Sequence, residues 1–145
     1  MIEIQIQKMF PDAILPTKKY NDPNGFHDLG WDLYAYEDCY IYENTVGMVR
    51  TGLRISLPND YGMVIKDRSS GSQKYEVVGG VYDPSYRGEI CVNIHNYKDH
   101  QVMIKKGEKF AQMVVIPNLY TVIKEVDIIS IDTPRGEGCL GSTDK

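Results

Sequence analysis

Residues 79–94 read GGVYDPSYRGEICVNI, in which a glycine pair and a polar turn lead into regular alternation of apolar and polar side chains. Ile90, Val92 and Ile94 stand at every second position, and side chains two residues apart lie on the same face of a β-strand. The stretch therefore predicts a turn followed by a half-buried strand. The same period of two recurs at Ile2, Ile4 and Ile6 and at Leu53, Ile55 and Leu57.

Further β-rich stretches spread outward from this one along most of the chain. YGMVIK, QVMIKK, FAQMVVIP and YTVIKEVDII are apolar or β-branched, and turn signals such as DPNG, LPNDYG and KKGE separate them. Helix is limited to one short turn near SSGSQKYE. Many short strands at fairly regular spacing predict an all-β fold, that is, a sandwich, a jelly roll or a distorted barrel.

Size and composition predict one domain with a tail. The 145 residues suit a single core, placed at residues 1–132, and residues 133–145 are rich in glycine, serine and charge, which is typical of a mobile arm. The net charge of −4 argues against a nucleic-acid partner, and the apolar runs are too short to span a membrane. Cys39, Cys91 and Cys139 form no zinc pattern, and free thiols in a reducing cytoplasm are the expectation.

Two motifs carry groups that suit a nucleotide, and each has a simpler explanation. Arg68, Ser69 and Ser70 in KDRSSGSQK could cradle a phosphate, although flexible polar loops often have this composition. Asp83 could orient and deprotonate a water, and Tyr86 could pack against a sugar, although for this motif alone a turn followed by a strand, with Tyr86 half-buried, is the simpler explanation.

Three further polar residues have the same ambiguity. Gln112 lies in an apolar strand, where an amide needs a partner, either a neighbouring strand or a ligand phosphate. Asp32 lies between large apolar residues and is expected to pair with an arginine or to face a cation. Arg135 lies among glycines in a loop that resembles an anion binder without the lysine of a P-loop.

The order of these motifs is far more specific than any one of them. GWDLYA, RSSGSQK, GGVYDPSYRGE, GEKFAQMVV and RGEGCLGST resemble, in sequence and spacing, the five motifs of the trimeric deoxyuridine triphosphatase (dUTPase) family. The resemblance implies a jelly-roll-like fold, a homotrimer, and hydrolysis of dUTP to dUMP and pyrophosphate with Mg²⁺. It also implies that the C-terminal arm closes over the site of a neighbouring subunit.

The resemblance assigns roles residue by residue. Asp83 matches the acid that activates water, and Tyr86 matches the ring under the deoxyribose that excludes a 2′-hydroxyl. Asp32 matches an acid that reaches the metal through water and does not bind it directly. The residues matched to substrate binding are Arg68, Ser69, Ser70 and Gln112 at the phosphates, Val77, Val81 and Tyr82 in the uracil hairpin, and Arg135, Leu140, Gly141 and Ser142 in the arm.

Departures from the family pattern leave alternatives open. Leu140 stands where an aromatic residue usually stacks on the uracil, and Tyr82 stands where a small aliphatic residue is typical. A related dCTP deaminase needs a glutamate ten positions after the motif aspartate, where this chain has Asn93. A catalytically weak regulatory protein that binds a protein partner is the remaining alternative to an active enzyme.

Overall fold

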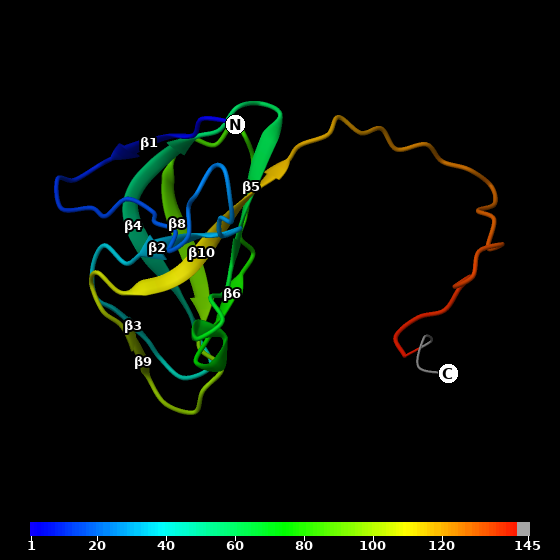
Figure 1. The fold of residues 1–145 in the computed structure, drawn as a ribbon. Helices are drawn as coiled ribbons and strands as arrows, with labels where there is room; N and C mark the ends of the chain where they lie inside the picture. Colours follow the sequence, from blue (N-terminus) through cyan, green and yellow to red (C-terminus); the bar gives the residue numbers. More distant parts are fainter. Residues whose placement is uncertain (142–145) are drawn as a thin grey trace.

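The computed structural model describes residues 1–141 and is built from two four-stranded antiparallel sheets that enclose one apolar core (Figure 1). The first sheet has the order β1-β4-β8-β6 and the second has the order β2-β10-β5-β7, while β3 and β9 form a separate pair. The strands are β1 (Gln5–Lys8), β2 (Trp31–Tyr34), β3 (Cys39–Ile41), β4 (Val46–Ser56), β5 (Tyr61–Lys66), β6 (Glu76–Val78), β7 (Val81–Tyr82), β8 (Glu89–His95), β9 (Val102–Ile104) and β10 (Lys109–Pro117).

The core lies between the inner faces of the two sheets, and the alternation in the sequence explains which residues reach it. Ile90, Val92 and Ile94 of β8 are 2 % exposed or less, and Leu53, Ile55 and Leu57 are also buried. Across the core, the second sheet contributes Leu33, Met63, Ile65, Ala111 and Met113. The prediction of an all-β, jelly-roll-like fold is confirmed. The short helical turn near residue 70 is also present, as the 3₁₀ turn η1 (Gly71–Gln73).

The segment around Gly79 and Gly80 carries the chain from one sheet to the other. Strand β6 pairs with β8 in the first sheet, and β7 pairs with β5 in the second. Both glycines between these strands have positive φ, 75° and 86°, a region that side chains with a Cβ avoid. A Cβ on Gly80 would also lie 2.7 Å from the carbonyl oxygen of Ile65, so the close approach of the two backbones requires glycine.

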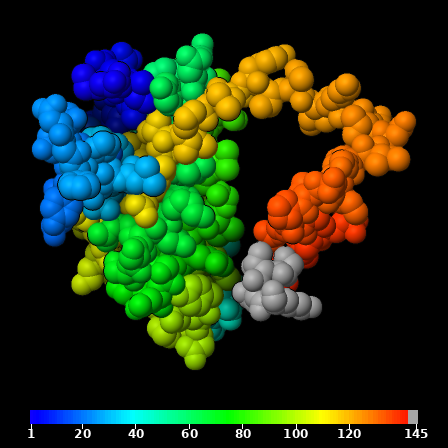
Figure 2. Space-filling view, turned by 45° about the vertical axis from the view of Figure 1, so that its right-hand side comes forward, coloured from blue at the N-terminus to red at the C-terminus, as the bar shows by residue number. Residues whose placement is uncertain are grey.

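Beyond Pro117 the chain leaves the sheets as an extended arm that stands apart from the body of the molecule (Figures 1 and 2). Its large apolar side chains are at least three-quarters exposed at Leu119, Tyr120, Val122, Ile123, Ile128 and Ile129. The prediction of a strand at YTVIKEVDII is wrong for this single chain, because the segment is extended but has no neighbouring strand among residues 1–141. The domain boundary after residue 132 stays a prediction.

Within residues 1–141, the structure contains no helix long and apolar enough to cross a membrane. Cys39, Cys91 and Cys139 are free thiols.

Candidate functional site

Four predicted or newly found polar residues meet where β2, β10 and the end of β5 adjoin. We call Asp32, Arg68, Lys109 and Gln112 the charged cluster. Asp32 on β2 accepts a hydrogen bond from Arg68 Nε at 2.8 Å through Oδ1 and forms an ion pair with Lys109 Nζ at 3.0 Å through Oδ2. The register of the sheet explains the meeting, because Gln112 on β10 stands opposite Asp32 on one side and opposite Lys66 of β5 on the other.

The electrostatics of the charged cluster favour an anion. One carboxylate faces two cations, so the cluster carries a net positive charge in a chain whose overall charge is −4. The hydrogen bond that Lys109 donates to Asp32, together with the negative charge of that carboxylate, raises the pKa of Lys109, so this ammonium stays protonated at neutral pH. Asp32 is mostly buried, with 19 % of its side chain exposed. Its two ion pairs therefore hold the ends of Arg68 and Lys109 in place near the surface.

Gln112 is fixed from two sides. Its Nε2 donates to the backbone oxygen of Asp67 at 2.7 Å, and the carboxylate of Asp67 in turn accepts from the backbone N of Val77 at 2.6 Å. A Cβ on Gly30 would lie 2.1 Å from Oε1 of Gln112, so the glycine leaves the space that the amide occupies. The partly buried amide thus donates one hydrogen bond within the fold, which is one of the two explanations that the sequence left open, and it links the charged cluster to β6.

The two serines after Arg68 are exposed at the start of η1. Ser69 accepts from Ser72 through its backbone oxygen at 2.8 Å, while Ser70 caps the 3₁₀ turn without a side-chain hydrogen bond. In the described part of the chain, neither serine hydroxyl is engaged in a hydrogen bond. Both hydroxyls are therefore available to a ligand beside the charged cluster.

A second group of residues lies in the turn between β7 and β8, which we call the acid–tyrosine turn (residues 83–88). The backbone N of Tyr86 donates to the oxygen of Asp83 at 3.1 Å, and Arg87 donates through Nη1 to the backbone oxygens of Pro84 and Tyr86. The phenol of Tyr86 donates to the backbone oxygen of Glu89 at 2.8 Å. The backbone of this turn is thus closed by its own side chains.

Asp83 is exposed at the start of this turn. Among residues 1–141 its carboxylate takes part in no ion pair and accepts no hydrogen bond. The contrast with Asp32 is direct, because Asp32 has two cationic partners at 2.8 and 3.0 Å. A rigidly presented acid without a partner is free to accept a proton from a bound water.

The acid–tyrosine turn and the charged cluster lie toward opposite ends of β5. Tyr82, directly before Asp83, stands opposite Met63, whereas Arg68 lies five residues further along the chain, beyond Lys66. At about 3.3 Å per residue along a strand, this places the two groups on the order of 15 Å apart in one chain. Within residues 1–141, no hydrogen bond or ion pair joins Asp83 to the charged cluster.

The hairpin that the sequence assigns to uracil runs between these two groups. The backbone of Val77 is held by Asp67, the oxygen of Gly80 accepts from Ile65 N at 2.7 Å, and Val81 pairs with Val64. Val81 exposes 76 % of its surface, so the hairpin backbone is reached from solvent on that side. The assigned role of the hairpin in reading the base stays a prediction.

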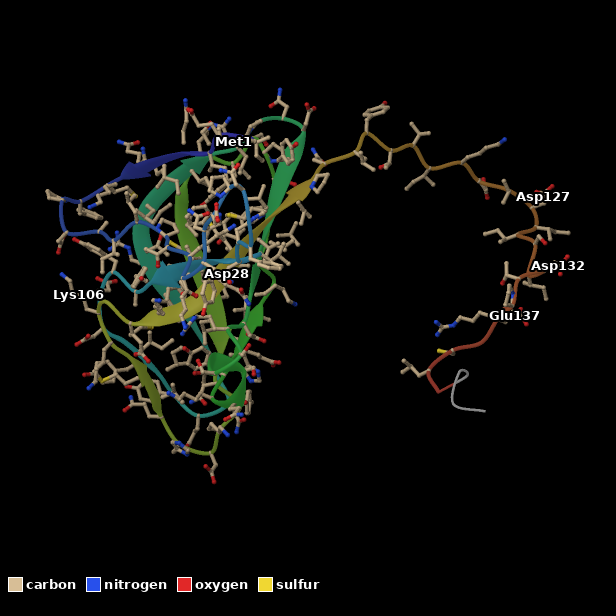
Figure 3. All side chains as sticks on the ribbon, viewed as in Figure 1. Met1, Asp28, Lys106, Asp127, Asp132 and Glu137 are labelled. Atoms are coloured by element: carbon tan, nitrogen blue, oxygen red, sulfur yellow. The ribbon has the colours of Figure 1, made fainter. Side chains whose placement is uncertain are left out.

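The arm residues lie far from both groups in this chain. Figure 3 shows Asp127, Asp132 and Glu137 along the arm, all well separated from the body of the molecule. Arg135 donates through Nε to the backbone oxygen of Gly138 at 2.9 Å, and Leu140 is 97 % exposed. Gly141 has a positive φ of 78°, and the predicted contact of Ser142 lies outside the described residues.

The described residues offer no group of three or more histidine, cysteine or acidic side chains that could hold a metal ion. A hollow of about 700 Å³ lies between the N-terminal residues and β2, but its lining is mainly apolar and includes none of the predicted site residues.

Sequence reasoning missed four residues of the site: Lys109, Asp67, Gly30 and Gly88. A Cβ on Gly88 would lie 2.4 Å from the phenol oxygen of Tyr86, so this glycine makes room for the ring. All four lie in or directly beside the quoted motifs. A sequence motif shows which residue types stand at which positions. It does not show which distant side chain fills the space beside a glycine, because that depends on tertiary packing.

Comparison with known proteins bears on this arrangement. The family model described as dUTPase matches residues 14–144. Deoxyuridine 5′-triphosphate nucleotidohydrolases of Gloeothece citriformis and of Helicobacter pylori strain Shi470 are 36 % and 33 % identical to the chain, each over 98 % of this chain and 97 % of the relative.

Solved structures show the same fold. The dUTPase of Staphylococcus bacteriophage 80alpha with dUpNHpp aligns with a TM-score of 0.81 at 23 % identity and covers 98 % of both chains. A mutant of the dUTPase from phage phi11 of S. aureus, whose structure shows the coordination of a structural Mg(II) ion, aligns with a TM-score of 0.75 at 20 % identity. It covers 88 % of this chain and 99 % of its own. With the family model matched over most of its length and relatives above 30 % identity, the chain belongs to the dUTPase family.

Proposed function

We propose that the protein hydrolyses dUTP to dUMP and pyrophosphate, with a water activated by Asp83 attacking the α-phosphorus. Curated relatives at 36 % and 33 % identity bear the name deoxyuridine 5′-triphosphate nucleotidohydrolase, and they align over nearly their full length. The observation that carries the proposal is the unpartnered Asp83 carboxylate, held at a braced turn in the motif that the family uses for its general base.

Asp83 acts as the proton acceptor. Attack at a phosphorus requires a water in line with the leaving group and a base within hydrogen-bond reach of that water. Because Asp83 has no cationic partner among residues 1–141, its carboxylate is not already committed to an ion pair. Tyr86, beside it in the turn, packs under the deoxyribose and leaves no room for a 2′-hydroxyl.

The charged cluster binds the phosphates. Arg68 and Lys109 supply fixed positive charge, and Ser69 and Ser70 supply hydroxyl donors that the fold leaves free. Phosphoryl transfer depends mainly on such positioning and on neutralising charge on the departing pyrophosphate. Gln112 adds an amide beside them, and Arg135 of the arm reaches the terminal phosphate when the arm closes.

The proposed reaction uses Mg²⁺ as its cofactor. The dUTPase of phage phi11, a structural relative, coordinates a structural Mg(II) ion. Asp32 is the acid of the charged cluster, and each of its oxygens already faces a basic group. These oxygens are therefore not free to bind a cation directly, which fits an ion that the triphosphate brings and holds. The ion supplies charge neutralisation at the phosphates. Asp32 holds Arg68 and Lys109 in place, and it is the acid that would reach such an ion through water.

We expect the active enzyme to be a homotrimer whose sites are shared between subunits. Two observations support it: the distance between Asp83 and the charged cluster along β5, and the apolar side chains that the arm exposes after Pro117. Exposed apolar rows of this kind are typical of surfaces that another chain covers. Each site then takes Asp83 from one subunit and Arg68 from another, and an arm closes over it. A nucleotide hydrolase of this kind acts in the cytoplasm.

The test measures pyrophosphate release from dUTP, dTTP, dCTP and UTP, with Mg²⁺ and with a chelator. We expect release from dUTP alone, loss of release with the chelator, and loss in Asp83→Asn. Ammonia release from dCTP is the readout for the deaminase alternative, and none is expected because Asn93 cannot carry protons at the amine. Absence of pyrophosphate from dUTP in the presence of Mg²⁺ would overturn the proposal.

A further inference from the structure

Tyr82 is matched to substrate binding as part of the uracil hairpin, but that match assigns no contact to its side chain. It stands directly before Asp83 at a position where the resemblance leads one to expect a small aliphatic residue. Its side chain is half-buried, and its phenol donates a hydrogen bond to the backbone oxygen of Cys91 in β8. The ring therefore spans from β7 in one sheet to β8 in the other.

The ring of Tyr82 also contacts the ring of Tyr86. The two ring centroids are 5.5 Å apart and the planes meet at 71°, an edge-to-face arrangement that aromatic pairs favour. Tyr86 is otherwise held at its tip, where the phenol donates to Glu89, and above Gly88, where a Cβ would leave no space for the ring. Contacts at its tip, beneath it and at its side thus fix the orientation of a side chain that is still 41 % exposed.

We propose that Tyr82 is a specificity-determining positioning residue, which holds the ring of Tyr86 at the orientation that rejects a ribose. The inference deepens the proposed function and rests on it for the substrate. Rejection of a hydroxyl by a flat ring depends on how little that ring can move. A small aliphatic side chain at position 82 would reach neither Cys91 nor the edge of Tyr86, so this chain has a brace that a smaller residue does not supply.

The hydrogen bond of the brace persists over the whole range of enzymatic pH. Burial raises the pKa of Tyr82 to about 12, with a smaller contribution from Tyr86, so the phenol keeps the proton that it donates to Cys91. The discrimination that the brace provides is accordingly independent of pH between about 6 and 9.

The experiment compares the full-length wild type with Tyr82→Phe and Tyr82→Val. In each, kcat/KM is measured for dUTP and for UTP, and the ratio of the two is the readout. Tyr82→Phe keeps the ring and loses only the bond to Cys91, and we expect the ratio to fall about threefold. Tyr82→Val loses the bond and the ring contact, and we expect a fall of about tenfold, mainly through faster turnover of UTP.

Thr51→Val is the matched control. Thr51 on β4 donates to the neighbouring β8 carbonyl, that of Ile90, at 2.7 Å, so this variant also loses one hydrogen bond to β8. Thr51 is fully buried, its hydroxyl also accepts from Leu53 N at 3.3 Å, and neither of these hydrogen bonds involves Tyr82 or Tyr86. We expect a loss of thermal stability with an unchanged ratio of dUTP to UTP. A merely structural role for Tyr82 would make Tyr82→Val behave like this control, with an unchanged ratio, and that result would overturn the inference.

A binding measurement separates the inference from the proposed function. Calorimetric titration with non-hydrolysable α,β-imido analogues of dUTP and UTP reports discrimination without turnover. If the wild type releases no pyrophosphate, a lower dUTP preference of Tyr82→Val in binding still supports the inference while the hydrolysis proposal fails. If the wild type hydrolyses dUTP and neither ratio changes in Tyr82→Val, the inference fails while the function stands.

Discussion

The charged cluster and the acid–tyrosine turn present an aspartate in two opposite ways. Asp32 is mostly buried and pairs with Arg68 and Lys109 through both oxygens. Asp83 is exposed, and the bonds that hold its turn are made by neighbouring backbone and by other side chains. The first acid orients other groups, and the second is itself held in position and left free to react.

This difference separates stability from chemistry. Removing a buried charge leaves its partners uncompensated, which costs folding energy, whereas removing an unpartnered surface charge costs almost none. The two aspartates should therefore differ in what their loss affects. Four experiments test that contrast, beginning with the largest expected effect.

Replacing Asp83 by asparagine should abolish the base without disturbing the fold. We expect kcat for dUTP to fall about 1000-fold, since positioned bases contribute about 10²- to 10⁴-fold. The free energy of unfolding should stay within about 0.5 kcal/mol of the wild type, because residues 1–141 give Asp83 no partner to lose. Pyrophosphate release and urea denaturation measure the two quantities, and normal turnover would contradict the assigned base.

Replacing Arg68 by glutamine should affect both quantities. We expect kcat/KM to fall about 100-fold through loss of a phosphate contact that is stronger in the transition state. We also expect the free energy of unfolding to fall by about 1 kcal/mol, because Asp32 keeps only Lys109.

Arg54→Gln is the matched control for Arg68→Gln. Arg54 is an exposed arginine on β4 that forms no ion pair within residues 1–141. It should change neither quantity measurably. Equal effects of the two variants would show that overall charge, and not the charged cluster, governs activity.

Replacing a glycine by alanine adds one methyl group, and one such change in the charged cluster and one in the acid–tyrosine turn should each disturb a different side chain. Gly30→Ala would collide with Gln112 in the charged cluster and should raise KM for dUTP about tenfold. Gly88→Ala would collide with Tyr86 and should lower the preference for dUTP over UTP by a similar factor. Gly71→Ala is the control, since its Cβ would meet Tyr75 only at 3.5 Å, an ordinary contact. A higher KM in the control as well would contradict the steric explanation.

Alkaline pH should produce the smallest effect. Burial raises the pKa of Tyr75 and Tyr82 from 10.0 to about 12 and that of Cys91 from 9.0 to about 11. A raised pKa means that the folded state binds the proton more tightly, so the stability it contributes is complete below the unfolded pKa and is lost above it. We expect the urea midpoint to be level up to pH 9 and to fall from there to about pH 12, and to fall less steeply in Tyr82→Phe. A midpoint that is level beyond pH 11 would contradict the burial of these groups.

The sequence allowed most of the strands and the order of the family motifs to be predicted, because both depend on local pattern. Alternation placed Ile90, Val92 and Ile94 in the core, and the positions of Asp32 and Asp83 in their motifs were recognisable from residue types. Pairing of Asp32 with an arginine was expected and is present, but which arginine it meets was not predictable from the same information. Whether Asp32 meets Arg68, a cation or water depends on the register between β2 and β10, which no local pattern records.

The arm also shows that local sequence does not determine which segments pair as strands. YTVIKEVDII has the composition of a strand, but a strand forms only where another backbone offers hydrogen bonds, and within residues 1–141 the arm has no such neighbour. The roles of Gly30 and Gly88 were hidden for a related reason. A glycine beside a functional residue shows its purpose only when the side chain that fills its missing Cβ is known.

The glycine pair at positions 79 and 80 joins the two sheets through a segment that both layers hold, β6 by pairing with β8 and β7 by pairing with β5. A shift of one sheet against the other would therefore move the segment for which a role in reading the base is proposed. Under the proposed function, nucleotide affinity would then report on the relative position of the two sheets.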